Sequence, residues 1–134
     1  MARIADIEGI GPSYAEKLAG AGIKTTDKLL EMGGTPKGRK EIATKSGVTE
    51  KLILGWVNRA DLTRIKGVGS EYADLLECAG VDTVPELKGR SAKNLHAKMA
   101  EVNEKKKLVR KLPTENQVTE WVAQAKKLKR AVSY

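Results

Sequence analysis

Two short glycine triplets are the features of this sequence that could do chemistry. Gly9-Ile10-Gly11 and Gly67-Val68-Gly69 each stand directly before a segment with helical apolar spacing. Glycine lets a backbone turn sharply and approach another molecule without a Cβ in the way, and the first turn of a helix offers N–H groups that attract anions. Each triplet therefore predicts a phosphate-binding site built from backbone amides, with the central apolar residue plugging the gap between two helices.

The residues around the second triplet suit an anion better than those around the first. Asp6 and Glu8 precede the first triplet, whereas Arg64 and Lys66 hold the same places before the second. Bases beside a phosphate favour binding by counterion release, and acids oppose it. We therefore expect the first triplet mainly to pack, although Gly9, Ile10 and Gly11 are candidates for the same contact. The binding residues expected at the second triplet are Arg64 and Lys66 through their charge, and Gly67, Val68, Gly69 and Ser70 through their amides.

The charge of the chain is concentrated towards its C-terminal end. The 134 residues include 25 Lys and Arg against 17 Asp and Glu, a net charge of +8. Residues 1–104 contribute +1 of this and residues 105–134 contribute +7. Such an excess favours a polyanionic partner, although charge runs often serve only solubility. Two clusters supply it: Lys105, Lys106, Lys107, Arg110 and Lys111, and then Lys126, Lys127, Lys129 and Arg130.

Residue types needed for catalysis or metal binding are scarce. The sequence has no Ser/His/Asp set, no carboxylate cluster and no ligand-spaced Cys/His group, so we expect no enzyme, metal or cofactor site. The single histidine, His96, is expected on a helix surface, and the single cysteine, Cys78, cannot form an internal disulfide. No segment approaches the roughly 18 apolar residues of a membrane span, and residues 1–6 are not a signal peptide. We expect a cytoplasmic protein without a membrane partner.

An internal repeat organises the chain. When the sequence is shifted by 58 residues, residues 4–29 align with residues 62–87 and ten of the 26 positions are identical. Chance would give about one or two. The match resumes weakly at Trp56-Val57 and Trp121-Val122. The repeat predicts two units of similar plan, residues 1–60 and residues 61–134, the second ending in a basic tail.

Capping residues, glycine stops and apolar spacing predict helices in both units, and the expected fold class is all-α. Each unit opens on a short apolar edge, Ile4 and Ile7 or Leu62 and Ile65, before its triplet and the helix that follows. Tyr14 and Tyr72 lie at matched places in those helices, where we expect them to pack against the preceding helix. The helix starts expected downstream are Thr26, Thr35, Thr49, Thr83, Ser91 and Thr114, and the expected stops are Gly22, Gly47, Gly80 and Leu112-Pro113.

Both triplets with their flanks resemble the helix-hairpin-helix motif of non-sequence-specific DNA-binding proteins. The residues that carry the likeness are Ile4, Ile7, Gly9, Ile10, Gly11, Tyr14, Ala15 and Leu18, and Leu62, Ile65, Gly67, Val68, Gly69, Tyr72, Ala73 and Leu76. The whole chain is similar to an uncharacterised bacterial family, a domain of unknown function built from tandem helix-hairpin-helix units. The resemblance implies two tandem (SAM-like) units in a compact helical array and a nucleic-acid role, without an established activity.

These observations lead us to expect a protein that binds nucleic acid, most readily duplex DNA, through the sugar–phosphate backbone with little sequence preference. Two other interpretations stay open. Helical units of this kind also serve as adaptors that dock a protein partner. Ala43, Gly47 and Ile53 have the spacing of a helix-turn-helix, whose second helix, residues 49–58, would read bases. Lys51 is the only base in residues 50–57, which favours a plain helix pair over that reading.

Overall fold

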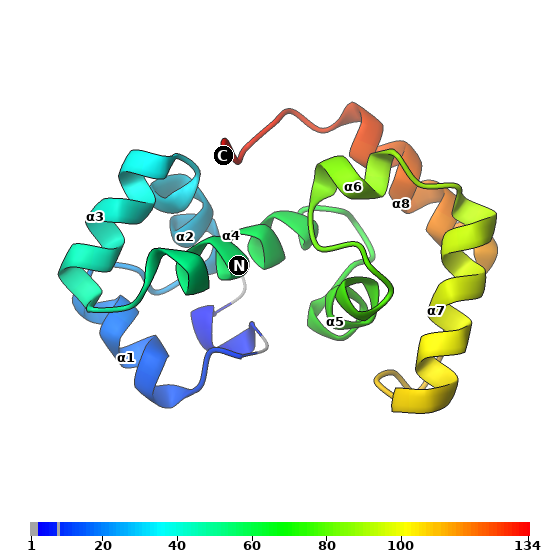
Figure 1. Ribbon diagram of the computed structural model, residues 1–134, viewed down its shortest axis with the longest axis horizontal. Helices are drawn as coiled ribbons and strands as arrows, with labels where there is room; N and C mark the ends of the chain where they lie inside the picture. The colour runs from blue at the N-terminus through cyan, green and yellow to red at the C-terminus, as the bar shows by residue number, and fades with distance from the viewer. Residues whose placement is uncertain (1–2, 8) are drawn as a thin grey trace. The chain divides into compact units, whose positions relative to one another are not determined.

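The computed structural model describes residues 3–7 and 9–134, and of Asp6 the backbone alone. Those residues form a short 3₁₀ turn, η1 (Ile4–Asp6), and eight α-helices (Figure 1). They contain no β-strand, and one isolated bridge pairs Arg3 with Thr25. The expected all-α class is therefore confirmed. The chain divides into two compact units: unit 1 is Met1–Asp61 together with Arg130–Tyr134, and unit 2 is Leu62–Lys129.

Unit 1 is built from α1 (Pro12–Gly20), α2 (Thr26–Gly33), α3 (Pro36–Ser46) and nearly all of α4 (Glu50–Leu62). The expected signals at α3 are confirmed, because Thr35 accepts a hydrogen bond from the Gly38 amide and Gly47 ends the helix at a φ of 75°. A left-handed residue at this place suits glycine and satisfies the last carbonyls. The buried core of unit 1 consists of Ile4, Ile7, Ile10, Leu18, Ile23, Leu29, Ile42, Val48, Ile53, Trp56, Val57, Ala60 and Val132.

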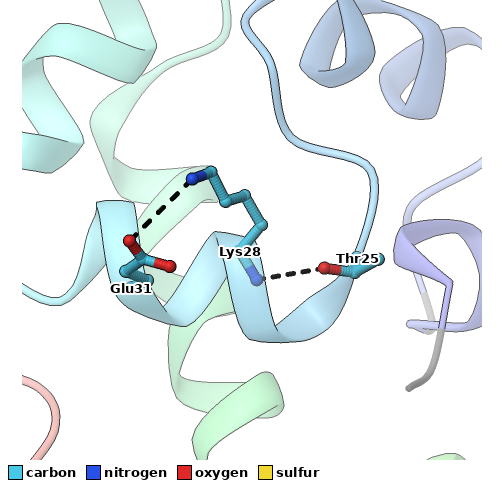
Figure 2. A network of polar contacts seen from close by, with 3 residues as sticks. All are labelled: Thr25, Lys28 and Glu31. Carbon is cyan, nitrogen blue, oxygen red and sulfur yellow. Dashed lines mark hydrogen bonds and ion pairs between the residues drawn. The ribbon is translucent and has the colours of Figure 1, made fainter.

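The start of α2 differs by one residue from the expectation. Thr25, and not Thr26, is the N-cap: its Oγ1 accepts a hydrogen bond from the Lys28 amide at 3.1 Å. Figure 2 shows this bond, and the ammonium of Lys28 lies 3.8 Å from the carboxylate of Glu31 one turn on. Thr26 is buried. The repeat aligns Thr25 with Thr83, which caps its own helix in the same way, so the repeat was the better guide to this boundary.

Unit 2 is built from α5 (Ser70–Cys78), α6 (Val84–Lys88), α7 (Ala92–Lys106) and α8 (Glu115–Lys127). The expected caps Thr83, Ser91 and Thr114 each accept a hydrogen bond from an amide three residues on, and Thr114 forms a complete capping box with Gln117. Helices α7 and α8 pack side by side (Figure 1). The largest fully buried side chains of this unit are Trp121, Leu62, Ile65, Leu75, Leu76, Leu87 and Leu95.

Helix α7 ends several residues before the expected stop at Leu112-Pro113. Its last residue is Lys106, because Lys107 turns left-handed at a φ of 50°. The side chain of Asn103 fixes the segment that follows, since its amide group donates to the Val109 carbonyl at 3.2 Å and accepts from the Val109 amide at 3.0 Å. Val109 is thereby buried. A side-chain bridge of this kind has no signature in helical periodicity, which explains why the boundary was predicted wrongly.

The last five residues pack into unit 1 instead of forming a basic tail on unit 2. Val132 is 2% exposed in the core of unit 1. The amide of Ser133 donates to the carbonyl of Gly34 at 2.7 Å, and the hydroxyl of Tyr134 donates to Asn58 at 2.8 Å. The buried guanidinium of Arg39 donates to the carbonyls of Gly33 at 2.9 Å and Ser133 at 2.7 Å. Unit 1 therefore contains residues from both ends of the sequence.

The role of the tail in unit 1 can be measured through Val132. Replacing Val132 by alanine removes two buried carbon atoms and leaves a cavity, so we expect the free energy of unfolding of unit 1 to fall by about 1.5–2.5 kcal/mol. Each unit has one tryptophan, so denaturation of a Trp121→Phe background followed by Trp56 fluorescence reports unit 1 alone. Leu52→Ala, at a side chain 39% exposed, is the control. Equal stability of Val132→Ala and its background would contradict the role given to the tail.

The left-handed conformation of Lys107 leads to a second prediction, in which a substitution increases stability. A side chain in this conformation costs about 1–2 kcal/mol, part of which glycine recovers, so Lys107→Gly should stabilise unit 2 by about 0.5–1 kcal/mol. Lys106→Gly, in the last turn of α7, should instead destabilise it by about 0.5–1 kcal/mol. Denaturation followed by Trp121 fluorescence in a Trp56→Phe background measures both. Destabilisation by both substitutions would mean that Lys107 is not left-handed in solution.

Candidate nucleic-acid interface

The two glycine triplets form turns of the same geometry. The first glycine of each is left-handed, with a φ of 91° at Gly9 and 97° at Gly67. The central residues Ile10 and Val68 are 3% and 4% exposed, which confirms them as plugs. Their amides donate to carbonyls three residues back, on Ile7 at 3.1 Å and Ile65 at 3.0 Å. This corrects one expectation, because the amides of Ile10 and Val68 are already occupied and only their side chains contribute.

The second glycine of each triplet leaves a helix start open. Gly11 and Gly69 are the N-caps of α1 and α5, both in extended conformation and both without a side-chain cap. A Cβ built at either residue would meet no atom within 4 Å. Within residues 3–7 and 9–134, the amides of Gly67 and Gly69 have no hydrogen-bond partner. Helix α5 begins with Ser70, whereas Pro12 removes one N–H donor from the start of α1. The second turn thus keeps more of the amides that an anion needs.

A tryptophan lies against each turn from the inside. A Cβ on Gly9 would lie 3.8 Å from the indole nitrogen of Trp56, and a Cβ on Gly67 would lie 3.0 Å from that of Trp121. The ring of Tyr14 is 5.1 Å from that of Trp56, and the ring of Tyr72 is 5.4 Å from that of Trp121. The tyrosines therefore pack on tryptophans from α4 and α8, which follow the turns in sequence, and on the core clusters that include the apolar residues before each turn.

The end of α8 is fastened to the second turn by three hydrogen bonds. Gln124 accepts from the Lys66 amide at 2.8 Å and donates to the Lys66 carbonyl at 3.1 Å, so one side-chain amide binds both backbone polar groups of one residue of the turn. The guanidinium of Arg64 donates to the carbonyl of Lys129 at 2.9 Å. The side chain of Lys66 stays exposed. These bonds bring Lys126, Lys127 and Lys129, all exposed, beside a turn about 60 residues earlier in the sequence.

The other basic cluster is fastened to α5, the helix that the second turn starts. The hydroxyl of Tyr72 donates to the carbonyl of Lys111 at 2.9 Å. At the other end of α5, the ammonium of Lys106 lies 4.0 Å from the sulfur of Cys78. Residues 105–111 are therefore joined to α5 by two side-chain contacts, and Lys105, Lys107, Arg110 and Lys111 are exposed. This cluster lies far after the second triplet in the sequence, and the structure joins it to the helix that the triplet starts.

Both clusters and the turn together form what we name the basic rim of unit 2. It is the set of exposed side chains of Lys66, Lys105, Lys106, Lys107, Arg110, Lys111, Lys126, Lys127 and Lys129. Unit 2 has 14 Lys and Arg against nine Asp and Glu, a net charge of +5, and unit 1 has 11 against eight, a net charge of +3. Arg130 does not join the rim, because it belongs to unit 1, where its Nε donates to the Val132 carbonyl at 2.9 Å.

Two residues that hold this site together were missed in the sequence. Gln124 gave no signal because Arg59 stands at the corresponding place of the first copy when Trp56 is aligned with Trp121. The hydroxyl of Tyr72 was missed because its repeat position suggested packing alone. Among the acids expected to weaken the first turn, Glu8 and the side chain of Asp6 lie outside the described residues.

The segment with helix-turn-helix spacing presents few side chains for reading bases. Gly47 makes the turn between α3 and α4 at a φ of 75°. Ile53, Trp56 and Val57 are buried, so the greater part of α4 faces the core. The exposed positions of its first half are Glu50, Lys51, Leu52 and Gly55. None of these four residues is an Arg, Asn or Gln, side chains that make bidentate hydrogen bonds to base edges.

The described part of the chain shows no sign of a metal site or a membrane span. No group of three or more His, Cys, Asp or Glu side chains in residues 3–7 and 9–134 is placed to hold a metal ion. No helix in those ranges is both long enough and apolar enough to cross a bilayer. His96, the single histidine, lies with its Nε2 2.8 Å from the carbonyl of Pro113, a contact that closes the loop before α8.

Comparison with known proteins gives a family and no function. No curated protein matches the chain, and no solved structure matches it. The family model described as a domain of unknown function (DUF4332) matches residues 8–128, which include both glycine triplets, both tryptophans and all of the basic rim except Lys129. Since the match extends over nearly the whole chain, this protein belongs to the DUF4332 family.

Proposed function

We propose that the protein binds nucleic acid, duplex DNA in particular, through the sugar–phosphate backbone and with little sequence preference. The observation that carries this proposal is that three basic segments of unit 2, distant in sequence, lie along α5 and the turn before it: Lys66, the end of α8, and residues 105–111. Hydrogen bonds from Gln124, Arg64 and Tyr72 hold those segments there. A chain that needed charge only for solubility would have no reason to fasten its bases to one turn.

In this proposal the two triplet turns are helix-hairpin-helix units, and the second is the binding one. The amides of Gly67 and Gly69 donate to a phosphate oxygen, with the N-terminal end of α5 adding its positive dipole. Lys66 and the end of α8 supply the neighbouring positive charge. The first turn has the same backbone but no basic clusters fastened to it, so it serves mainly as packing. Bacterial origin and a cytoplasmic location belong to the same proposal.

The absence of sequence preference follows from the groups involved. Backbone amides and lysine ammonium groups contact phosphates, which are alike at every base pair, whereas reading a sequence requires side chains at base edges. Aromatic residues are few in this chain, with no phenylalanine, and both tryptophans are at most 6% exposed. Stacking on unpaired bases is therefore unavailable to the tryptophans, which favours duplex over single-stranded nucleic acid.

The proposed contact between backbone amides and phosphate is tested by replacing one glycine in each turn with alanine, at positions where a Cβ meets no other atom. A Cβ at Gly69 meets no protein atom within 4 Å and adds bulk at a residue whose amide is proposed to contact the phosphate, so Gly69→Ala should weaken duplex DNA binding about five- to tenfold. Gly11→Ala makes the same change at the first turn and should change affinity less than about twofold. Fluorescence anisotropy with a random 20-base-pair duplex measures both, and thermal unfolding checks stability. Equal affinities for the two variants would contradict the assignment to the second turn.

The basic rim predicts a steep dependence on salt. If about five to seven phosphates are contacted, the logarithm of the affinity should fall with the logarithm of salt concentration at a slope of about −4 to −6. Reversing two rim charges in Lys66→Glu/Lys127→Glu should reduce that slope by about 2 and the affinity at low salt at least about tenfold.

The matched control for the rim is Lys24→Glu/Lys28→Glu, which changes the net charge equally in unit 1, where Lys28 already pairs with Glu31. If the rim and control variants lose the same affinity, binding depends on net charge and not on this site. If neither variant binds DNA differently from the original protein, and the original binds only weakly, an adaptor function through protein docking takes the place of this proposal.

A further inference from the structure

The outward face of α3 in unit 1 holds a second group of basic side chains. Lys37, Lys40, Glu41, Thr44 and Lys45 line an open hollow of about 370 Å³ on this helix. The opposite face of α3 is buried through Ile42 and Arg39. Long side chains with charged ends thus line the hollow, as is common where such side chains cover apolar surface.

The charged side chains of this face make no ion pair or hydrogen bond with the described part of the chain. Three lysines stand against one glutamate, and none of these four side chains has an ion pair or a hydrogen bond with any described residue. Glu41 lies four residues from both Lys37 and Lys45, a spacing that permits ion pairs on a helix, yet it pairs with neither. Exposed lysines elsewhere in the described chain, such as Lys28 and Lys98, do have acidic partners.

Helix α3 is a rigid support for these lysines. Its start is capped by Thr35 at 3.0 Å from the Gly38 amide, and its end is fixed by the left-handed Gly47. Gly38 allows a close approach to the carbonyl of Met32, where no Cβ would fit. The two carbonyl contacts of buried Arg39 hold the middle of the helix. A charged face on a fixed helix loses little backbone entropy when a ligand binds.

The spacing of the lysines suits an extended polyanion. Lys37 and Lys45 are eight residues apart, about 12 Å along the helix, and Lys40 lies between them. Each strand of duplex DNA presents a phosphate about every 3.4 Å of its axis, so a face of this length matches several successive phosphates. We propose that the outward face of α3 is a second DNA-backbone-binding surface, which does not depend on the hairpin site of unit 2.

The surface is tested first by neutralising its lysines in the full chain. Lys37→Gln/Lys40→Gln/Lys45→Gln should weaken binding to a random 20-base-pair duplex about five- to tenfold and reduce the salt slope by about 2 to 3. The control Lys24→Gln/Lys28→Gln/Lys51→Gln removes the same charge from exposed positions of unit 1 and should change affinity less than about twofold. Glutamine keeps the helix, and circular dichroism verifies that it does.

A gain of affinity is the sharper test, because misfolding cannot produce it. Glu41 is the only acid of the hollow, so Glu41→Gln should strengthen DNA binding about two- to threefold at low salt. Glu50→Gln, at an exposed acid in the first turn of α4, is the matched control and should leave the affinity unchanged. The inference is overturned if the triple lysine variant matches its control, or if Glu41→Gln brings no gain.

The outcomes separate this inference from the proposed hairpin function. The α3 variants are measured again in a Gly69→Ala/Lys66→Glu/Lys127→Glu background, which disables the hairpin site. Residual salt-dependent binding that the α3 lysine substitutions abolish supports the second surface even if the hairpin proposal fails. Loss of all binding in that background, with no effect of α3 in the original chain, overturns the second surface alone. Binding of anionic phospholipid vesicles through α3, without binding of DNA, overturns it in favour of a membrane surface.

Discussion

The left-handed first glycine of each triplet is the constraint on which this structure depends. At a φ of 91° or 97° an L side chain is strained, and at Gly67 a Cβ would also lie only 3.0 Å from the indole nitrogen of Trp121. The sharp reversal lets the plug residue enter the core, while the next glycine of the triplet becomes an N-cap without a side-chain cap. One backbone angle therefore links core packing to the exposed polar groups from which the proposed function is argued.

The two copies keep the turn and differ in what surrounds it. Trp56 and Trp121 make the same contacts with their turns, and both following helices end in the same way, where Ile23 and Val81 donate to the carbonyls of Leu18 and Leu76. The second copy alone adds the clamp from Gln124 and the hydrogen bond of Tyr72 to the basic loop. A duplicated scaffold can thus acquire a charged surface in one copy without any change in its core.

Features that depend on residues close in sequence were predicted, and features that depend on residues far apart in sequence were not. Helix caps at Thr35, Ser91 and Thr114 and the stop at Gly47 depend on neighbours three or four residues away, and they were predicted correctly. The early end of α7 depends on a side chain reaching round a loop, and the path of the tail depends on Gly34, about a hundred residues away. Such contacts have no local pattern. The residues of the candidate site were named from charge and spacing, but how they are joined required the structure.

The return of residues 130–134 to unit 1 has a consequence for the order of biosynthesis. A ribosome makes the helices of unit 1 first, yet the valine that fills their core and the carbonyl that satisfies Arg39 emerge only after all of unit 2 has been made. Unit 2, whose core is continuous in sequence, has no such delay. The part of the protein that is translated first is therefore the part that is completed last, and until then it exposes an apolar slot to the cell's chaperones and proteases.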